Sequence, residues 1–424
     1  MHWKNTIIFL SISLGFSTSS IGQNKDTVSL TLSQAENLFF EKNYQLLAAK
    51  YHIDAAAAGI INARLWENPT ISLEQSAYNK NTNKWFETGK AGETAISAEQ
   101  LIPLGRKRYH RIEIEKINTQ IATSQFYDLI RNLRVELRTS FWQLYHLQQS
   151  ISVYDQEINS VNALIKALKI QLNEGNVPFR EIARLQALLF NLENEKLARR
   201  KDLRENQSTL LILTGDTLQH EIKPIVDNPT YKPDLQLIKI SELIDTALIN
   251  RYDYQIANEQ VQLNKATLAL QKSIRMPDFT LSAKWDKHGG YINNYNAVSL
   301  QASIPLWNRN QGNIKQAQSQ ISESSQQVFQ LENTIKNDIY KAYNQLTEAD
   351  SLYLTASLQF NESYDKLING ISAGYKNRTI SLLEFIDYFE TYKESKIQFF
   401  QLHQNVIEAM EDLNLATGKI LFNN

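Results

Sequence analysis

The sequence predicts a mainly α-helical protein with a small β part, built from two copies of one structural unit. Glycine and proline are scarce, with 14 and 8 among 424 residues, roughly half their usual shares of ~7% and ~5%. The prolines border two long proline-free stretches, 104–177 and 306–424. Because proline inside a helix costs about 3 kcal/mol, long helices are expected in these two stretches.

Composition excludes several classes of protein. The chain has 44 Lys+Arg against 45 Asp+Glu, so nothing in its charge favours nucleic acid as a partner. It has no cysteine, which excludes disulfides, thiolate metal sites, cysteine nucleophiles and an acylated N-terminal cysteine. We therefore expect a chain that is not lipid-anchored.

The first 22 residues have the pattern of a secretory signal peptide. Lys4 precedes an apolar stretch, 7–16, and small residues follow up to Gly22, where cleavage is expected. No later window approaches the ~18 uninterrupted apolar residues of a spanning helix. The exported chain is therefore expected to be either soluble outside the cytoplasm or a β-barrel in an outer membrane.

Each proline-free stretch is expected to fold as a long helical hairpin, about 106–214 and 312–417. Apolar residues recur there at alternating steps of three and four, the spacing of a coiled-coil seam. A helix over 106–172 would be roughly 100 Å long at ~1.5 Å per residue. A glycine stop marks each tip. The first tip, 173–178, holds Gly175, Asn176, Val177 and Pro178, and the second, 374–378, holds Gly374, Tyr375, Asn377 and Arg378.

The two halves of the chain repeat the same order of elements. A shift of 208 residues aligns Ser33 with Ser241 and Pro69 with Pro277, and a shift of 199 aligns the two tip glycines. Such duplication predicts one unit used twice. The first unit is 23–215 and the second 241–424, with a proline-rich linker, 216–240, between them. Ser33-Gln34-Ala35-Glu36 is expected to form a capping box at the first helix.

Four segments of about ten residues are candidates for transmembrane strands. They are 70–78, 94–102, 278–286 and 297–304, and apolar and polar residues alternate along them, as expected of strands facing lipid on one side. Aromatic residues typical of membrane interfaces lie in or near them: Trp66, Tyr78, Trp85, Trp285, Tyr291, Tyr295 and Trp307. A soluble sheet that caps a helical bundle is the alternative. Because a closed membrane barrel needs about eight strands, the membrane interpretation requires several chains.

Taken together, the sequence resembles the TolC-type outer-membrane efflux family. The resemblance rests on the duplicated halves, "ENPTISL" and "MPDFTLS" at the first strand of each half, "LIPLGRKR" and "IPLWNRNQG" where strand passes to helix, and "GYKNRTISLLEFID" at the second tip. It implies a homotrimer whose 12-stranded barrel meets outer-membrane lipid and continues as an α-helical tunnel through the periplasm. It also implies a passive duct served by a periplasmic adaptor and an inner-membrane pump, of which the resistance-nodulation-division type is one candidate. The cargo stays open between drugs, metal ions and proteins.

The resemblance also suggests functional residues. The eight tip residues would form the periplasmic end of the tunnel and the adaptor contact, or serve only as helix caps and turns. Tyr375 and Arg378 could tie neighbouring helices in a closed state. Glu384 and Asp387, three residues apart and hence on one helix face, could form acidic gate rings that favour cations, or lie on a solvated outer face.

No catalytic set, phosphate loop or zinc spacing is present, so we expect no enzyme, cofactor or bound metal. His403 and Glu408 are expected at the surface. The basic cluster Arg106-Lys107-Arg108 is expected on a solvated helix face, where it could also meet lipid headgroups or line the tunnel. A soluble periplasmic coiled-coil adaptor or scaffold is the alternative function, and membrane extraction would separate it from the channel.

Overall fold

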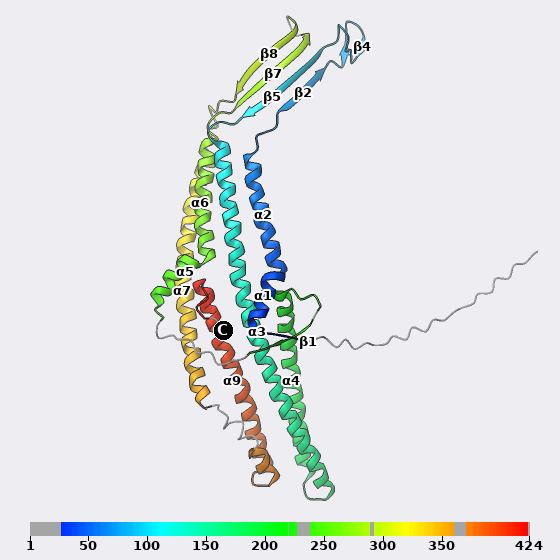
Figure 1. Cartoon of the computed structure of the whole chain (residues 1–424), viewed down its shortest axis with the longest axis vertical. Helices are drawn as coiled ribbons and strands as arrows, with labels where there is room; N and C mark the ends of the chain where they lie inside the picture. The colour runs from blue at the N-terminus through cyan, green and yellow to red at the C-terminus, as the bar shows by residue number, and fades with distance from the viewer. Residues whose placement is uncertain (1–26, 219, 227–237, 289–291, 360–369, 423–424) are drawn as a thin grey trace, which may run out of the picture.

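The structure is a computed structural model that describes residues 27–218, 220–226, 238–288, 292–359 and 370–422. Long helices stand side by side, and a four-stranded sheet extends beyond one end of them (Figure 1). The two helical tips lie at the opposite end. Residues 1–22, the expected signal peptide, and Tyr291 lie outside the described residues.

Both halves contain the same order of helices. The first half has α1 (Leu32–Lys42), α2 (Tyr44–Arg64), α3 (Lys107–Asn173) and α4 (Phe179–Thr214). The second half has α5 (Ile240–Asn250), α6 (Tyr252–Ser273), α7 (Gln311–Gln359), an unnumbered helical segment 370–376, and α9 (Leu382–Thr417). The first hairpin thus has nearly the predicted bounds, whereas the returning helix of the second begins three residues later than Thr379.

The strands also follow the predicted segments, with three differences. They are β1 (Thr27–Leu30), β2 (Thr70–Gln75), β3 (Tyr78–Asn79), β4 (Lys84–Trp85), β5 (Thr94–Ile102), β6 (Glu221–Pro224), β7 (Phe279–His288) and β8 (Asn293–Ala302). The segment 70–78 splits, because Tyr78 pairs with Trp85 in a small separate hairpin. Strands β7 and β8 extend further into the loop than predicted, and β8 ends before residue 304. The main sheet is antiparallel in the order β2-β5-β7-β8.

The helices form four parallel columns, in which two single long helices, α3 and α7, alternate with two pairs of shorter helices stacked end to end. Helices α2 and α4 stack end to end along α3, and α6 and α9 stack end to end between α3 and α7. Helix α7 forms one edge of this arrangement, and the α2/α4 column forms the other (Figure 1). Searched over the described residues, none of these helices has the length and apolarity needed to cross a bilayer.

Each end-to-end joint depends on a glycine. Gly215 after α4 and Gly418 after α9 adopt left-handed φ angles of 66° and 69°. A Cβ on Gly215 would lie 2.4 Å from the carbonyl oxygen of Lys42, so only glycine fits there. Asn43 binds the end of α4 through Nδ2 and the Leu213 carbonyl, 3.0 Å apart. At the second joint Arg251, 208 residues later, binds the end of α9 in the same way, through Nη1 and the Ala416 carbonyl.

One predicted cap is wrong, and the predicted linker contains a strand that the sequence did not indicate. The linker 216–240 contains β6, which pairs in parallel with β1, an unpredicted strand. Both strands are short, but Leu30 and Ile222 are buried in the core. The capping box of α1 is made by Thr31 and Gln34 rather than by Ser33 and Glu36. The core consists of two apolar clusters, an upper one around the joints and a lower one near the tips.

Candidate functional site

The first tip is a glycine turn at the end of α3. Gly175 has φ +77°, its N–H donates to Leu172 O, and the N–H of Asn176 donates to Gln171 O, each at 2.9 Å. These two bonds satisfy two of the last carbonyls of α3. Pro178 is the N-cap of α4. Asn176 and Pro178 are exposed and Val177 is half-buried, so the tip presents both polar and apolar groups to solvent.

The second tip has the same geometry but not the predicted glycine. Gly374 is still helical, and the left-handed residue is Arg378, with φ 60°. The Arg378 N–H donates to Tyr375 O and the Thr379 N–H to Gly374 O, at 3.0 and 2.9 Å. Gly175 therefore corresponds to Arg378 and not to Gly374, so the predicted alignment of the two tip glycines is wrong. A non-glycine residue in this conformation costs roughly 1–2 kcal/mol.

The two tips are held together by an apolar cluster with one hydrogen bond across it. The Tyr375 ring lies 5.3 Å from that of Phe385, which lies 5.2 Å from Phe389. Buried Tyr375 donates its hydroxyl to Glu181 Oε2 of the first hairpin at 3.1 Å. Burial, followed by the charge of Glu181, raises the pKa of Tyr375, so this hydroxyl stays protonated.

Further along the hairpins, a second polar contact joins them. Lys393 of α9 and Glu195 of α4 form an ion pair of 2.7 Å, and Glu195 also accepts from the hydroxyl of Tyr154 at 3.2 Å. Glu157 of α3 is buried beside them, and neither of its carboxylate oxygens has a hydrogen-bond partner among the described residues. Burial raises the pKa of Glu157 to about 8, with Lys393 acting against the shift and Glu195 adding to it. Sequence reasoning missed this group, because a glutamate in a helical seam has no distinguishing signal.

The structure gives Glu384 a local role that the sequence analysis did not anticipate. Its Oε2 accepts from the backbone N–H of Ser381 at 2.7 Å, while the Ser381 hydroxyl accepts from the Glu384 N–H, a capping box that opens α9. Hydrogen bonds from the Ser381 backbone and side chain lower the pKa of Glu384. Glu384 and Asp387 are both exposed in the single chain.

The main sheet has one apolar and one polar face. Directly paired residues share a face, so the register puts Ile71, Leu73, Ile96, Ala98, Leu281, Ala283, Trp285, Val298 and Leu300 on one side. The other side carries Ser72, Glu74, Ser97, Glu99, Ser282, Lys284, Ser299 and Gln301. Ile71 and Val298 are 75% and 77% exposed. An apolar face this exposed is suited to lipid.

The predicted interfacial aromatics fall into two groups along this sheet. Trp66 and Trp307 precede β2 and follow β8 at the helical end, and are 57% and 88% exposed. Tyr78 and Trp85 lie in the β3–β4 hairpin at the far end, with rings 5.1 Å apart. Trp285 is half-buried on the apolar face. Tyr295 pairs with Asp286 on the polar face. Its position along the strand, near the loop, fits a membrane interface, but the face of the sheet on which it lies does not.

The basic cluster at the start of α3 is not simply solvated, which corrects the prediction for Lys107. This side chain is 7% exposed and binds Asp278 Oδ1 at 2.7 Å, and its ammonium also donates to Met276 O at 2.8 Å. The guanidinium of Arg108 lies 4.8 Å from the centre of the Trp66 ring. These contacts connect the passages between helices and sheet in the two halves.

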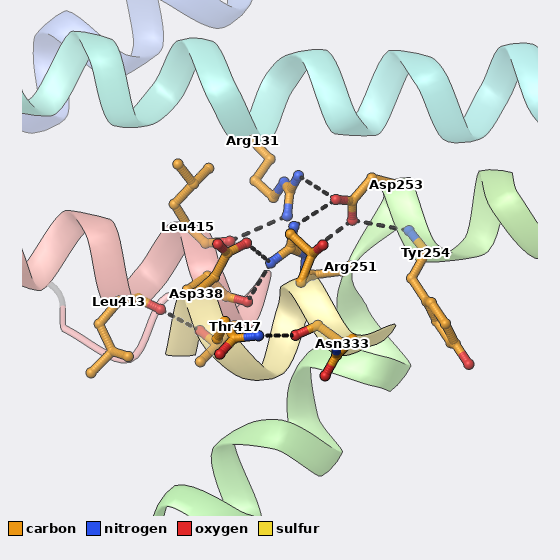
Figure 2. A network of polar contacts seen from close by, with 12 residues as sticks. Arg131, Arg251, Asp253, Tyr254, Asn333, Asp338, Leu413, Leu415 and Thr417 are labelled. Carbon is orange, nitrogen blue, oxygen red and sulfur yellow. Dashed lines mark hydrogen bonds and ion pairs between the residues drawn. The ribbon is translucent and has the colours of Figure 1, made fainter. Parts of the chain in front are cut away.

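An ion network centred on the buried Arg251 surrounds the second helix joint (Figure 2). Arg251 contacts Asp253 at 2.6 Å and Asp338 at 3.0 Å, and its Nη1 donates to Ala416 O at 3.3 Å. Arg131 of α3 reaches Leu415 O at 3.2 Å. Burial acts to raise the pKa of Asp253, but hydrogen bonds from Arg251 and the charge of Arg131 hold it below its usual value. The network therefore ties α3, α6, α7 and α9 at one level.

His403 is buried, contrary to the prediction of a surface position. Its ring lies 4.9 Å from Tyr353 and 5.0 Å from His146, which is buried too. Burial lowers the pKa of His146 to about 3 and that of His403 to about 4, so both rings are neutral at pH 7. Glu408 is half-buried. Among the described residues, no group of three or more His, Asp or Glu side chains could hold a metal ion.

Comparison with known proteins is consistent with this geometry and assigns the chain to a protein family. A sequence profile of outer membrane efflux proteins matches residues 37–216 and 243–419. The chain belongs to the outer membrane efflux protein family. Among curated relatives, this efflux protein is similar to the cobalt-zinc-cadmium resistance protein CzcC of Cupriavidus metallidurans, at 20% identity over 92% of the chain and 90% of CzcC.

Solved structures of low identity share the fold of this efflux protein. The outer membrane channel CmeC of Campylobacter jejuni aligns with a TM-score of 0.76 and 14% identity, covering 99% of this chain and 95% of CmeC. The open state of the Neisseria gonorrhoeae channel MtrE aligns with a TM-score of 0.70 and 14% identity, covering 92% and 89%. As a member of the outer membrane efflux protein family, the chain is the outer-membrane channel of a tripartite efflux system, and the family implies a trimer that works with an adaptor and an inner-membrane pump.

Proposed function

We propose that three copies of this chain form a passive duct from the periplasm to the outside, in which three sheets of four strands close into one 12-stranded barrel. The main support for this proposal is the unpaired edges of the four-stranded sheet. Within the described residues, β2 and β8 each pair on one side only, and unpaired strand edges are sites for pairing with another chain. The apolar face would then meet outer-membrane lipid and the polar face would line the lumen.

The helical edges support the same assembly. The α2 edge exposes Tyr44, Tyr51 and Ile61, between 62% and 73%, and the α7 edge exposes Phe329 and Leu352, at 64% and 59%. Exposed apolar stripes on both edges of one layer fit contacts between neighbouring subunits. Alternating columns from three chains would continue the barrel as a helical tunnel through the periplasm.

The tips are the proposed docking surface for the adaptor. The eight residues predicted there lie at the hairpin tips or just before the second tip, in the helical segment 370–376, and these tips would form the periplasmic end of the duct. Exposed Asn176, Pro178, Asn377 and Arg378 are the ones an adaptor would reach first. Substituting Asn176 and Asn377 by tryptophan should weaken adaptor binding in a pull-down, whereas tryptophan at exposed Ile249 on α5 should not.

A gate just inside the tips is proposed at Glu384 and Asp387. Both carboxylates are exposed within one chain and come from the first turns of α9, so three copies could form acidic rings. Glu384→Gln with Asp387→Asn should lower the cation preference of the reconstituted channel. Unchanged selectivity would place these groups outside the conduction path.

Divalent metal cations are the proposed cargo class. The support is the similarity to a protein named for cobalt, zinc and cadmium resistance, and the inner-membrane partner would then be a pump of the resistance-nodulation-division type. Loss of this chain should sensitise its host to zinc, cobalt or cadmium. Sensitisation to organic biocides alone would contradict the metal assignment. We propose no enzymatic activity.

The duct and the alternative soluble scaffold differ in membrane behaviour. The proposal includes export by a signal peptide cleaved after Gly22, which sequencing of the mature N-terminus would test. Protein purified in detergent from the outer-membrane fraction should appear as threefold particles with a short barrel and a long helical tube. A protein that washes off without detergent, or a thin rod with no barrel, would reject the duct.

A further inference from the structure

The four passages between the helices and the main sheet carry a large excess of positive charge. They lie at one level, where the helices end and the sheet begins (Figure 1), and comprise residues 64–69, 103–111, 272–278 and 303–315. These segments contain nine lysines and arginines but two carboxylates, Glu67 and Asp278. Because the whole chain has 44 basic and 45 acidic residues, the excess is local to this level.

Most of this charge has no partner within the protein. Lys107 is paired with Asp278, and Arg111 with Glu67. Six other basic residues are exposed and form no ion pair with any residue that the structure describes. These six form the basic belt: Arg64, Arg106, Lys272, Arg275, Arg309 and Lys315.

Helix stability explains only part of the basic belt. Arg64 and Lys272 lie in the last turns of α2 and α6, where a positive charge is favourable. Arg106, by contrast, is the N-cap of α3, and Arg309 lies two residues before α7. The start of a helix favours negative groups, so these two arginines are better matched by an anion outside the chain.

Exposed apolar side chains share this level with the basic belt. Leu65, Ile304 and Leu306 are each more than half exposed, as are Trp66 and Trp307. Tryptophan beside lysine and arginine is the composition of a membrane interface, where the charged ends reach the headgroups and the apolar stems cover apolar surface. The apolar face of the sheet follows next along the chain. A soluble anion would gain nothing from apolar neighbours, so the surroundings favour a lipid.

We propose that the basic belt binds the phosphate groups of anionic phospholipids in the leaflet around the periplasmic end of the barrel. This inference rests on the proposed duct, because the apolar face of the sheet must meet lipid for the belt to reach headgroups. In a trimer the belt is repeated three times around the barrel. Each basic side chain near an anionic surface adds an attraction that weakens as ionic strength rises.

The test measures lipid binding to the detergent-purified trimer by native mass spectrometry, on samples whose threefold particles are verified by negative-stain imaging. The probes are dioctanoyl phosphatidylglycerol, which is anionic, and dioctanoyl phosphatidylcholine, which has the same acyl chains and no net charge. Glycerol 3-phosphate presents the headgroup phosphate without acyl chains.

Two triple variants remove the same amount of charge from different places. The belt variant combines Arg106→Gln, Arg275→Gln and Arg309→Gln. The control variant combines Arg180→Gln, Arg184→Gln and Arg200→Gln, all at exposed positions on α4. Threefold particles of both variants show that neither set of substitutions prevents folding or assembly.

The proposal predicts that phosphatidylglycerol binds about tenfold more tightly than phosphatidylcholine, and that this preference shrinks with added salt. The belt variant should lose most of the preference and the control variant should keep it. Equal binding of the two lipids by threefold particles, or an unchanged preference in the belt variant, would overturn the proposal and leave the duct standing.

Two other results would also overturn it. Displacement of the lipid by millimolar glycerol 3-phosphate would assign the basic belt to a soluble anion. Altered ion selectivity of the belt variant in planar bilayers, with its lipid preference unchanged, would place the belt in the lumen. A protein that washes off the membrane without detergent would reject the duct and the lipid site together.

Discussion

Replacing Glu157 by glutamine should remove the pH dependence of contact between the two hairpins. The glutamate is 3% exposed, and its pKa responds to the charges of Lys393 on α9 and Glu195 on α4. Lys393 is already paired with Glu195 at 2.7 Å, so an ionised Glu157 would lack a cation of its own. Separation of the hairpins would expose its carboxyl group to water.

The sign and size of the effect follow from the pKa. Burial raises it from 4.5 to about 8 in the closed contact, and exposure returns it toward 4.5. The closed contact therefore keeps a proton that the open form has lost, so its stabilisation is fully present below pH 4.5 and is lost as the pH rises through about 8. At 1.36 kcal/mol per pKa unit, the difference between the two limits is roughly 5 kcal/mol. The glutamine variant should stay closed throughout.

Spin labels can report the separation, since the chain has no cysteine of its own. Labels at Arg180→Cys and Asn377→Cys, both exposed near the tips, should show a distance distribution that broadens as the pH rises from about 4.5 to about 8. Glu157→Gln should abolish the broadening, whereas Glu193→Gln, which changes an exposed carboxylate on α4, should retain it. The same broadening in the Glu157→Gln protein would refute the reasoning.

Three further predictions concern other polar contacts. Tyr375→Phe removes a hydrogen bond to a carboxylate of the other hairpin. The open probability in single-channel recordings should therefore rise about tenfold. An unchanged open probability would mean that this bond does not hold the tip closed. Lys107→Met should lower trimer stability by up to about 3 kcal/mol because Asp278 loses its cation, and adding Asp278→Asn should recover most of the melting temperature. Burial lowers the pKa of His146 to about 3 and that of His403 to about 4, so their contribution to stability is present above pH 6.5 and is lost as the pH falls toward 4. Phenylalanine at both sites should therefore make the melting temperature less dependent on pH below 6.5. Equal acid sensitivity in this variant would count against the prediction.

The features that depend on local pattern were predictable from the sequence. Proline positions and 3/4 spacing predicted α3 and α4 almost to the residue, and alternation predicted β5 over 94–102. Periodicity identifies an element because its repeat is a local property of the backbone. Periodicity also separated the two sheet faces, although polar residues interrupt the apolar face, and two of them are glutamines. Both lie at the sheet ends and bond to backbone, Gln100 to Glu67 O at 2.9 Å and Gln75 to Glu87 O at 3.0 Å.

The errors arose where a residue's role depends on a partner distant in sequence. Strands β1 and β6 are each four residues long and make a ladder only because chain segments nearly two hundred residues apart meet. His403 and Lys107 are polar groups whose burial depends on what packs over them. Arg378, rather than Gly374, takes the left-handed position, since the length of the preceding helix decides where the turn begins.

By itself, the sequence determined the two helical hairpins, the duplicated order of elements and the four amphipathic strands, because each is encoded in spacing along the chain. Only the tertiary structure decided which buried charges are paired. It showed Arg251 bound at the helix joint, Glu157 without a partner among the described residues, and Arg138 with one donor left over. The physical reason is that desolvation and pairing are set by groups brought together from several helices, and no spacing within one helix records them.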